Sequence, residues 1–165
     1  MTGKYHHLSN LLPVVHCVKA SQGWEIAPAL APYVARAAAV IEKPAFGSLA
    51  LPEAVRSLRP EAIELTGLCT DICVIANAMI LKAAFPEIPI SVDASCCAGV
   101  TPDSHENALA AMKMCQVYIV RCDSVVCGSF LKKIPVVAII VDGEHTLGVR
   151  MADAMCRRLI RPLAC

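Results

Sequence analysis

The residue type in this chain with the most chemical potential is cysteine, which occurs ten times in 165 residues. The cysteines form no CxxC pair, and no paired Cys/His knuckle of the zinc type is present. Several lie inside apolar runs, where a free cysteine behaves as a small core residue. The pattern argues against a disulfide framework, a structural zinc site or a redox protein, and it directs attention to single cysteines as nucleophiles.

The stretch Gly-Leu-Cys-Thr-Asp-Ile-Cys-Val at residues 67–74 is the best candidate for such chemistry. A predicted strand ends at Leu68, a tight turn follows, and a helix begins near Asp71, which places Cys73 in the first helical turn. Unpaired N–H groups and the positive end of the helix dipole stabilise a thiolate there. The same N–H groups can hold the oxyanion of a tetrahedral intermediate. The alternative, which spacing alone leaves open, is a buried and inert structural cysteine.

The elements that must position Cys73 follow from alternating apolar runs and helical periodicities. Strands are predicted at 38–42, 62–68 and 88–94, and helices at 51–58, 71–85 and 102–116. Thr70 or Asp71 is the expected N-cap of the second helix, and Thr101 that of the third. This alternation predicts an α/β fold with a parallel sheet, in which the strands at 62–68 and 88–94 are central neighbours. The site is expected beyond the carboxyl ends of these strands, at 67–73 and 93–100.

The last 45 residues differ in charge from the rest. Residues 1–120 carry eight basic and ten acidic side chains, a balance of −2, whereas 121–165 carry seven and four, a balance of +3. We therefore divide the chain into a core at 1–120 and an extension at 121–165, with a strand expected at 134–141 and a basic helix at about 144–160. A shifted reading frame, a fusion, or a genuine extension that packs 134–141 on an open sheet edge would each produce such an end.

Composition excludes several function classes. Hydrophobic residues make up 56% and charged residues 18%, so the chain can bury enough surface to fold. A net charge of +1 gives no electrostatic case for nucleic acid. The longest apolar stretch, 134–141, is too short to span a bilayer, and the start lacks the features of a signal peptide. These features predict a cytoplasmic protein that binds neither nucleic acid nor membrane.

Four segments of the chain together resemble one enzyme family. They are LPVVHCVKASQGWEI at 12–26, VIEKPAFGS at 40–48, the whole of 63–83, and VDASCCAGVTPDSHENAL at 92–109. In this order they resemble the nicotinamidase/isochorismatase-like cysteine hydrolases, closest to the nicotinamidase branch. The resemblance implies a three-layer αβα fold with a parallel sheet. It also implies hydrolysis of a small amide, with nicotinamide to nicotinate and ammonia as the nearest type reaction.

The resemblance also implies roles for individual residues. Cys73 matches the family's nucleophile, and Lys43 matches the lysine whose charge favours the ionised thiol. The oxyanion hole would use the backbone amides of Cys69 and Cys73, with a cis peptide at Leu68–Cys69. His16 matches the last histidine of a divalent metal site, such as a zinc site, where the metal polarises the pyridine nitrogen of the substrate.

Two parts of the family pattern have no match in the sequence. The third triad member, an aspartate on the family's first strand, has no counterpart, because Asp71 is expected to cap a helix and Asp93 to end a strand. The Asp-x-His pair that should precede His16 is also absent, and His6 and His7 have a different spacing. We therefore expect a chain that lacks the first strand and hydrolyses amides slowly, or a non-catalytic member that keeps only the core. The flank of the sheet would be covered by the extension or by a second subunit in a homo-oligomer.

Overall fold

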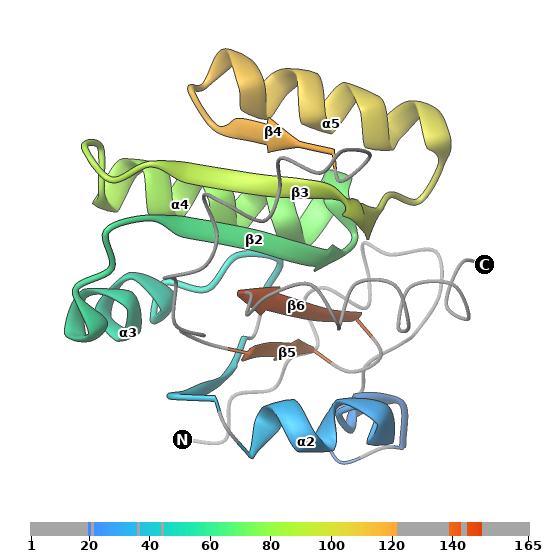
Figure 1. Ribbon diagram of the computed structural model, residues 1–165. Helices are drawn as coiled ribbons and strands as arrows, with labels where there is room; N and C mark the ends of the chain where they lie inside the picture. The colour runs from blue at the N-terminus through green and yellow to red at the C-terminus, as the bar shows by residue number, and fades with distance from the viewer. Residues whose placement is uncertain are drawn as a thin grey trace.

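The computed structural model describes residues 20, 22–35, 37–43, 45–121, 139–142 and 145–149, and Figure 1 shows how their elements are arranged. The helices are η1 Gln22–Trp24, η2 Pro28–Leu30, α2 Ala31–Val34, α3 Leu51–Leu58, the π-helical turn η3 Thr70–Val74, α4 Ile75–Ala84 and α5 Pro102–Met114. The strands are β1 Val40–Glu42, β2 Ile63–Leu68, β3 Ile90–Ala98, β4 Tyr118–Val120, β5 Ile139–Asp142 and β6 His145–Val149.

These strands form one sheet in the order β1-β5-β6-β2-β3-β4. β2 pairs with β3 in parallel, with Leu65 opposite Val92, which confirms the predicted pairing of these strands. β3 pairs in parallel with β4, and β1 with β5. The expected parallel sheet is thus confirmed, and among the described strands only β6 runs against its neighbours.

The antiparallel hairpin of β5 and β6 comes from the C-terminal extension and lies inside the sheet, between β1 and β2. The strand expected at 134–141 is observed over Ile139–Asp142, while 134–138 lie outside the described residues. The helix expected at 144–160 is wrong over His145–Val149, because these residues pair with β2 on one side and β5 on the other. Residues 150–160 lie outside the described part of the chain.

The helices α3 and α5 agree with their sequence signals. α3 has Pro52 in its first turn and is followed by its C-cap Arg59, which has a left-handed backbone (φ 48°). α5 begins with a capping box, in which the Thr101 side chain accepts from the Ser104 N–H and the Ser104 side chain accepts from the Thr101 N–H. Local capping therefore fixes both helices, although α5 ends at Met114 rather than at 116.

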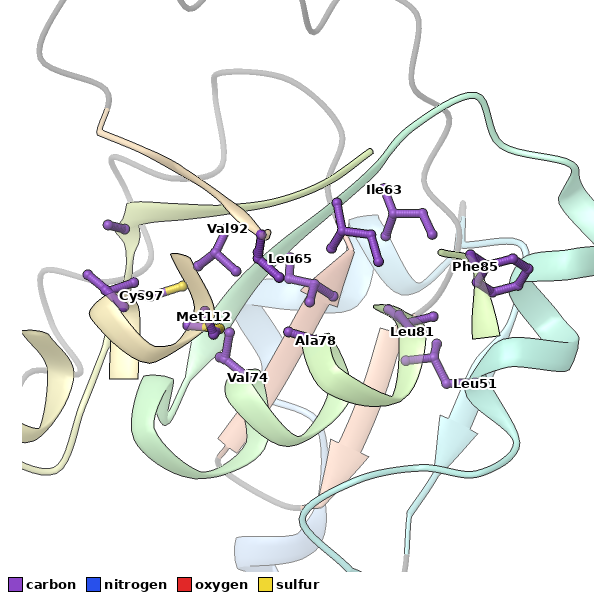
Figure 2. Close-up of a cluster of buried hydrophobic side chains, with 14 of the residues drawn as sticks. Leu51, Ile63, Leu65, Val74, Ala78, Leu81, Phe85, Val92, Cys97 and Met112 are labelled. Carbon is purple, nitrogen blue, oxygen red and sulfur yellow. The ribbon is translucent and has the colours of Figure 1, made fainter. Parts of the chain in front are cut away.

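The apolar core lies between the sheet and a layer of three helices. α3 contacts α4, α4 contacts α5, and α4 and α5 pack on β3. Figure 2 shows Leu65 and Val92 of the sheet directed at Val74, Leu81 and other side chains of that layer. The alternate β2 residues face the other side of the sheet, and these are also buried (Glu64 and Thr66). Strands β2 and β3 are thus covered on both faces, as the apolar sequence of these strands predicts.

No helix in the described ranges has the length and apolar character that a membrane span requires.

The position of β5 gives a test of the sheet order. Ile140 is paired on both sides, with Ile41 of β1 and Leu147 of β6, so its N–H is bonded whichever way it points. Ile140→Pro removes that hydrogen bond and adds a ring clash, at a cost on the order of 2 kcal/mol. We expect the thermal midpoint to fall by roughly 5 °C or more, measured by circular dichroism.

The matched control is Ile140→Val, which keeps the N–H and the β-branch. Equal thermal midpoints for the proline and valine variants would show that this segment is not paired within the sheet in solution.

Candidate active site

Lys43 and Cys73 meet at the carboxyl edge of the sheet. Lys43 directly follows β1, and Cys73 lies in η3, the turn that follows β2. The Lys43 Nζ lies 3.4 Å from the Cys73 Sγ and donates a hydrogen bond to it. Both residues are 5% exposed. The structure therefore brings together the two side chains that the sequence analysis singled out as catalytic.

The burial of Lys43 has a direct electrostatic consequence. A buried ammonium group is costly unless it is paired and hydrogen-bonded. Lys43 Nζ donates to the backbone oxygen of Ala45 at 3.2 Å as well as to Cys73 Sγ. Because a cation at this distance favours the charged form of an acid, the arrangement favours the thiolate of Cys73.

The turn that carries Cys73 has an unusual backbone. The Leu68–Cys69 peptide bond is cis, at the position that the family resemblance implied. Gly67 has φ 121°, a conformation that glycine adopts without a steric penalty. The Val74 N–H donates to the Cys69 oxygen at 3.0 Å, an i→i−5 bond that makes the turn π-helical. The backbone amides of Cys69 and Cys73, the expected oxyanion hole, both belong to this turn, and their role stays a prediction.

The expected caps of the helix after β2 are wrong. Cys69, in an extended conformation, precedes η3 and makes no side-chain capping hydrogen bond. The Asp71 carboxylate instead accepts from the Val100 N–H, with both oxygens at 3.2 Å. The Thr70 Oγ1 is hydrogen-bonded to the His105 Nδ1 at 2.8 Å. Both side chains therefore tie the turn after β2 to the segment after β3.

Asp93 was expected at the end of a strand, and this is also wrong. β3 continues four residues further than predicted, to Ala98, so Asp93 lies within the strand and is fully buried. Its Oδ1 accepts from the Ser95 N–H at 3.0 Å, and its Oδ2 lies 3.2 Å from the Cys96 Sγ. Cys96 is disulfide-bonded, which the sequence analysis did not anticipate.

Cys97 differs from Cys73 in its electrostatic surroundings. Burial raises the pKa of the Cys97 thiol to about 12, and the carboxylates of Asp93 and Glu64 add to the rise, while a hydrogen bond with the backbone of Gly67 opposes it. Cys97 lies within β3 itself, whereas Cys73 lies in the turn after β2 beside the Lys43 ammonium. Cys97 stays protonated at neutral pH, as an inert core cysteine does.

The expected metal site is not tested by the structure. His16, His6 and His7 lie outside the described residues. Within the described ranges, no three side chains of the His, Cys, Asp and Glu types gather in a way that would hold a metal ion. We therefore assign no chemical step to a metal.

Two residues that contact the turn after β2 were not predicted from the sequence. His105 pairs with Thr70 from the first turns of α5, and nothing in its local sequence signals this long-range contact. Asn77 is fully buried in α4 and hydrogen-bonds to the backbone of Phe46, Ser48 and Cys73. A signal for Asn77 was present, because asparagine is a poor helix former and stands alone among apolar neighbours at 75–81.

Comparisons with known proteins agree with this geometry. The family model described as "Isochorismatase domain" matches residues 2–124. A crystal structure of nicotinamidase PncA from Bacillus subtilis is similar, with 23% sequence identity, a TM-score of 0.58, and coverage of 72% of this chain and 69% of that chain. A structure of nicotinamidase/pyrazinamidase PncA from Bacillus subtilis has 22% identity with the same TM-score and coverage. No curated protein sequence is significantly similar to this chain.

The contact between Lys43 and Cys73 predicts the pH dependence of thiol chemistry. We expect Lys43→Met to raise the pH midpoint of Cys73 alkylation by iodoacetamide by about one to three units, because the nearby cation is lost. Peptide mapping by mass spectrometry gives the midpoint for each cysteine, and the exposed free thiol of Cys115 is the internal reference.

Lys82→Met is the matched control, because Lys82 lies on α4 and donates to the Pro86 oxygen at the far end of that helix. An equal midpoint for Cys73 and Cys115 in the unmodified chain would contradict an activated thiol.

The raised pKa of Cys97 predicts an alkaline loss of stability. Its pKa is about 12 in the folded chain against 9.0 for a thiol in water, so the stability that the buried thiol contributes is complete below pH 9 and is lost as pH rises toward 12. We expect Cys97→Ala to lose less free energy of unfolding than the unmodified chain between pH 8 and about 10.5. Urea denaturation across this range measures the difference, and parallel curves for the two chains would contradict the prediction.

Proposed function

The chain belongs to the isochorismatase domain family, and we propose that within it the chain is a nicotinamidase-like cysteine hydrolase of small amides. The observation that carries the proposal is the 3.4 Å contact between the Lys43 ammonium and the Cys73 sulfur at the carboxyl edge of the sheet. This contact supports a thiolate nucleophile at the position where open α/β sheets place their active sites. The similarity to nicotinamidase structures supports nicotinamide as the first substrate to test.

In the proposed reaction, the Cys73 thiolate attacks the amide carbonyl carbon and forms a C–S bond. The negative charge moves to the carbonyl oxygen, where the backbone amides of Cys69 and Cys73 donate hydrogen bonds to it. The C–N bond then breaks, a proton goes to the leaving nitrogen, and ammonia departs. Water hydrolyses the thioester, which releases the carboxylic acid and regenerates the thiol.

No described residue is assigned as the general acid–base that would transfer a proton to the leaving nitrogen. Asp71 accepts from the Val100 N–H and Asp93 from the Ser95 N–H, so we assign neither of them as the general acid–base. General acid–base catalysis typically contributes about 10²–10⁴-fold. The proposal therefore includes slow turnover of an amide, whose leaving group needs a proton, and faster acylation by a p-nitrophenyl ester, whose phenolate leaving group does not.

A two-substrate experiment tests this proposal. With the p-nitrophenyl ester of nicotinic acid, we expect a burst of p-nitrophenol of about one equivalent per chain, as an acyl-enzyme accumulates on the nucleophile. With nicotinamide, we expect ammonia release about 10²–10⁴-fold below the usual enzyme range of about 1–10³ s⁻¹. Cys73→Ala should abolish both, and Cys115→Ala, which removes an exposed thiol, should abolish neither.

Each result has a defined meaning. No burst, or a burst that survives in Cys73→Ala, contradicts the hydrolase proposal and favours a non-catalytic member of the family. Nicotinamide turnover in the usual range contradicts the slow proton transfer and shows that another residue supplies the carboxylate.

A further inference from the structure

We propose that Asn77 is a positioning residue that holds Lys43 against Cys73. The inference rests on the proposed function in one respect, namely that the thiolate of Cys73 is the nucleophile. Asn77 lies on α4, one helical turn after Cys73, and is fully buried. It is a polar residue in a helix that is otherwise packed by apolar side chains, so its burial requires hydrogen bonds.

The sheet does not by itself bring Lys43 to Cys73. Two strands, β5 and β6, separate β1 from β2. Three strand spacings correspond to about 14 Å, a distance greater than a lysine side chain spans. The segment after β1 must therefore turn toward α4 and be held there for the 3.4 Å contact between Lys43 and Cys73 to exist.

The side chain of Asn77 makes this connection with three hydrogen bonds. Its Oδ1 accepts from the Ser48 N–H at 2.9 Å, and its Nδ2 donates to the Phe46 oxygen at 3.0 Å and to the Cys73 oxygen at 2.8 Å. Both N–H donors of the amide are thus used. One side chain bridges the backbone of the segment that follows Lys43 and the backbone of Cys73 itself.

The packing of the same segment on α4 supports this role independently. A Cβ atom added to Gly47 would lie 2.5 Å from the Ile80 Cδ1 and 3.6 Å from the Ala76 Cβ, so the segment lies directly on the helix. Lys43 is joined to this segment through its hydrogen bond to the Ala45 oxygen. Displacement of the segment from α4 would therefore carry the ammonium away from the thiol.

Two substitutions of Asn77 distinguish its hydrogen bond to Cys73 from its hydrogen bonds to Phe46 and Ser48. Asn77→Thr keeps a hydroxyl that can donate to the carbonyl four residues earlier, that of Cys73, but it is too short to hold Phe46 and Ser48. Asn77→Ala removes all three bonds. We expect both to raise the pH midpoint of Cys73 alkylation by about one unit, which corresponds to an about tenfold lower acid dissociation constant of the thiol.

The midpoint is the readout because a loosened segment also changes the access of iodoacetamide, which alters the plateau rate but not the midpoint. Val92→Ala is the matched control, since it removes buried apolar volume on β3 without touching the bridge. We expect its midpoint to equal that of the unmodified chain. If the asparagine variants fail to fold, Gly47→Ala replaces them in the experiment. It crowds the same segment against α4 without changing Asn77, and we expect it to shift the midpoint in the same direction.

A double-mutant cycle with Lys43→Met decides the mechanism. If Asn77 acts through Lys43, the shift caused by Asn77→Thr disappears once the ammonium is absent. An equal shift in both backgrounds, or a shift equal to that of Val92→Ala, overturns the proposal. These measurements require no amide turnover, so the absence of hydrolysis would contradict the proposed function and leave this inference standing on its own result.

Discussion

The arrangement of the site depends on one constraint, the burial of the Lys43 ammonium beside the Cys73 sulfur. Burying an unpaired cation costs free energy, and each acceptor that is hydrogen-bonded to Lys43 reduces that cost. The sulfur provides an acceptor that becomes better as it ionises, so the cation and the thiolate stabilise each other. This mutual dependence requires that the end of β1 and the turn after β2 be held at a fixed separation, although they are not neighbours in the sheet.

Local sequence signals predicted the parts of the fold that local interactions determine. α3 was placed at its exact residues, because a proline at its start and one after its end bound it. The Thr101 cap of α5 and the pairing of β2 with β3 were also predicted, since capping and short strand–helix–strand connections are encoded within a few residues. The turn that carries Cys73 was predicted because its residues are contiguous in the sequence.

The errors lie where distant parts of the chain decide the structure. His145–Val149 has a helix-compatible sequence context, yet it forms a strand because β2 and β5 offer pairing partners on both sides. Asp71 and Thr70 have the residue types of helix caps, but Val100 and His105, about 30 residues away, take their hydrogen bonds. No local sequence pattern indicates these contacts. The residue types of the site were therefore predictable from the sequence, but these long-range hydrogen bonds were not.

Those missed connections share one physical role. Thr70 and Asp71 attach the turn after β2 to the end of β3 and the start of α5, whereas Asn77 attaches its helix to the segment after β1. The turn is thereby held from two sides by side chains within eight residues of one another. The Thr70 and Asp71 side chains bond to His105 and Val100 instead of capping their own helix. The short motif 67–74 is therefore specific in sequence, but its geometry is set by the ends of three strands, which explains why a motif match alone did not reveal what holds Cys73 in place.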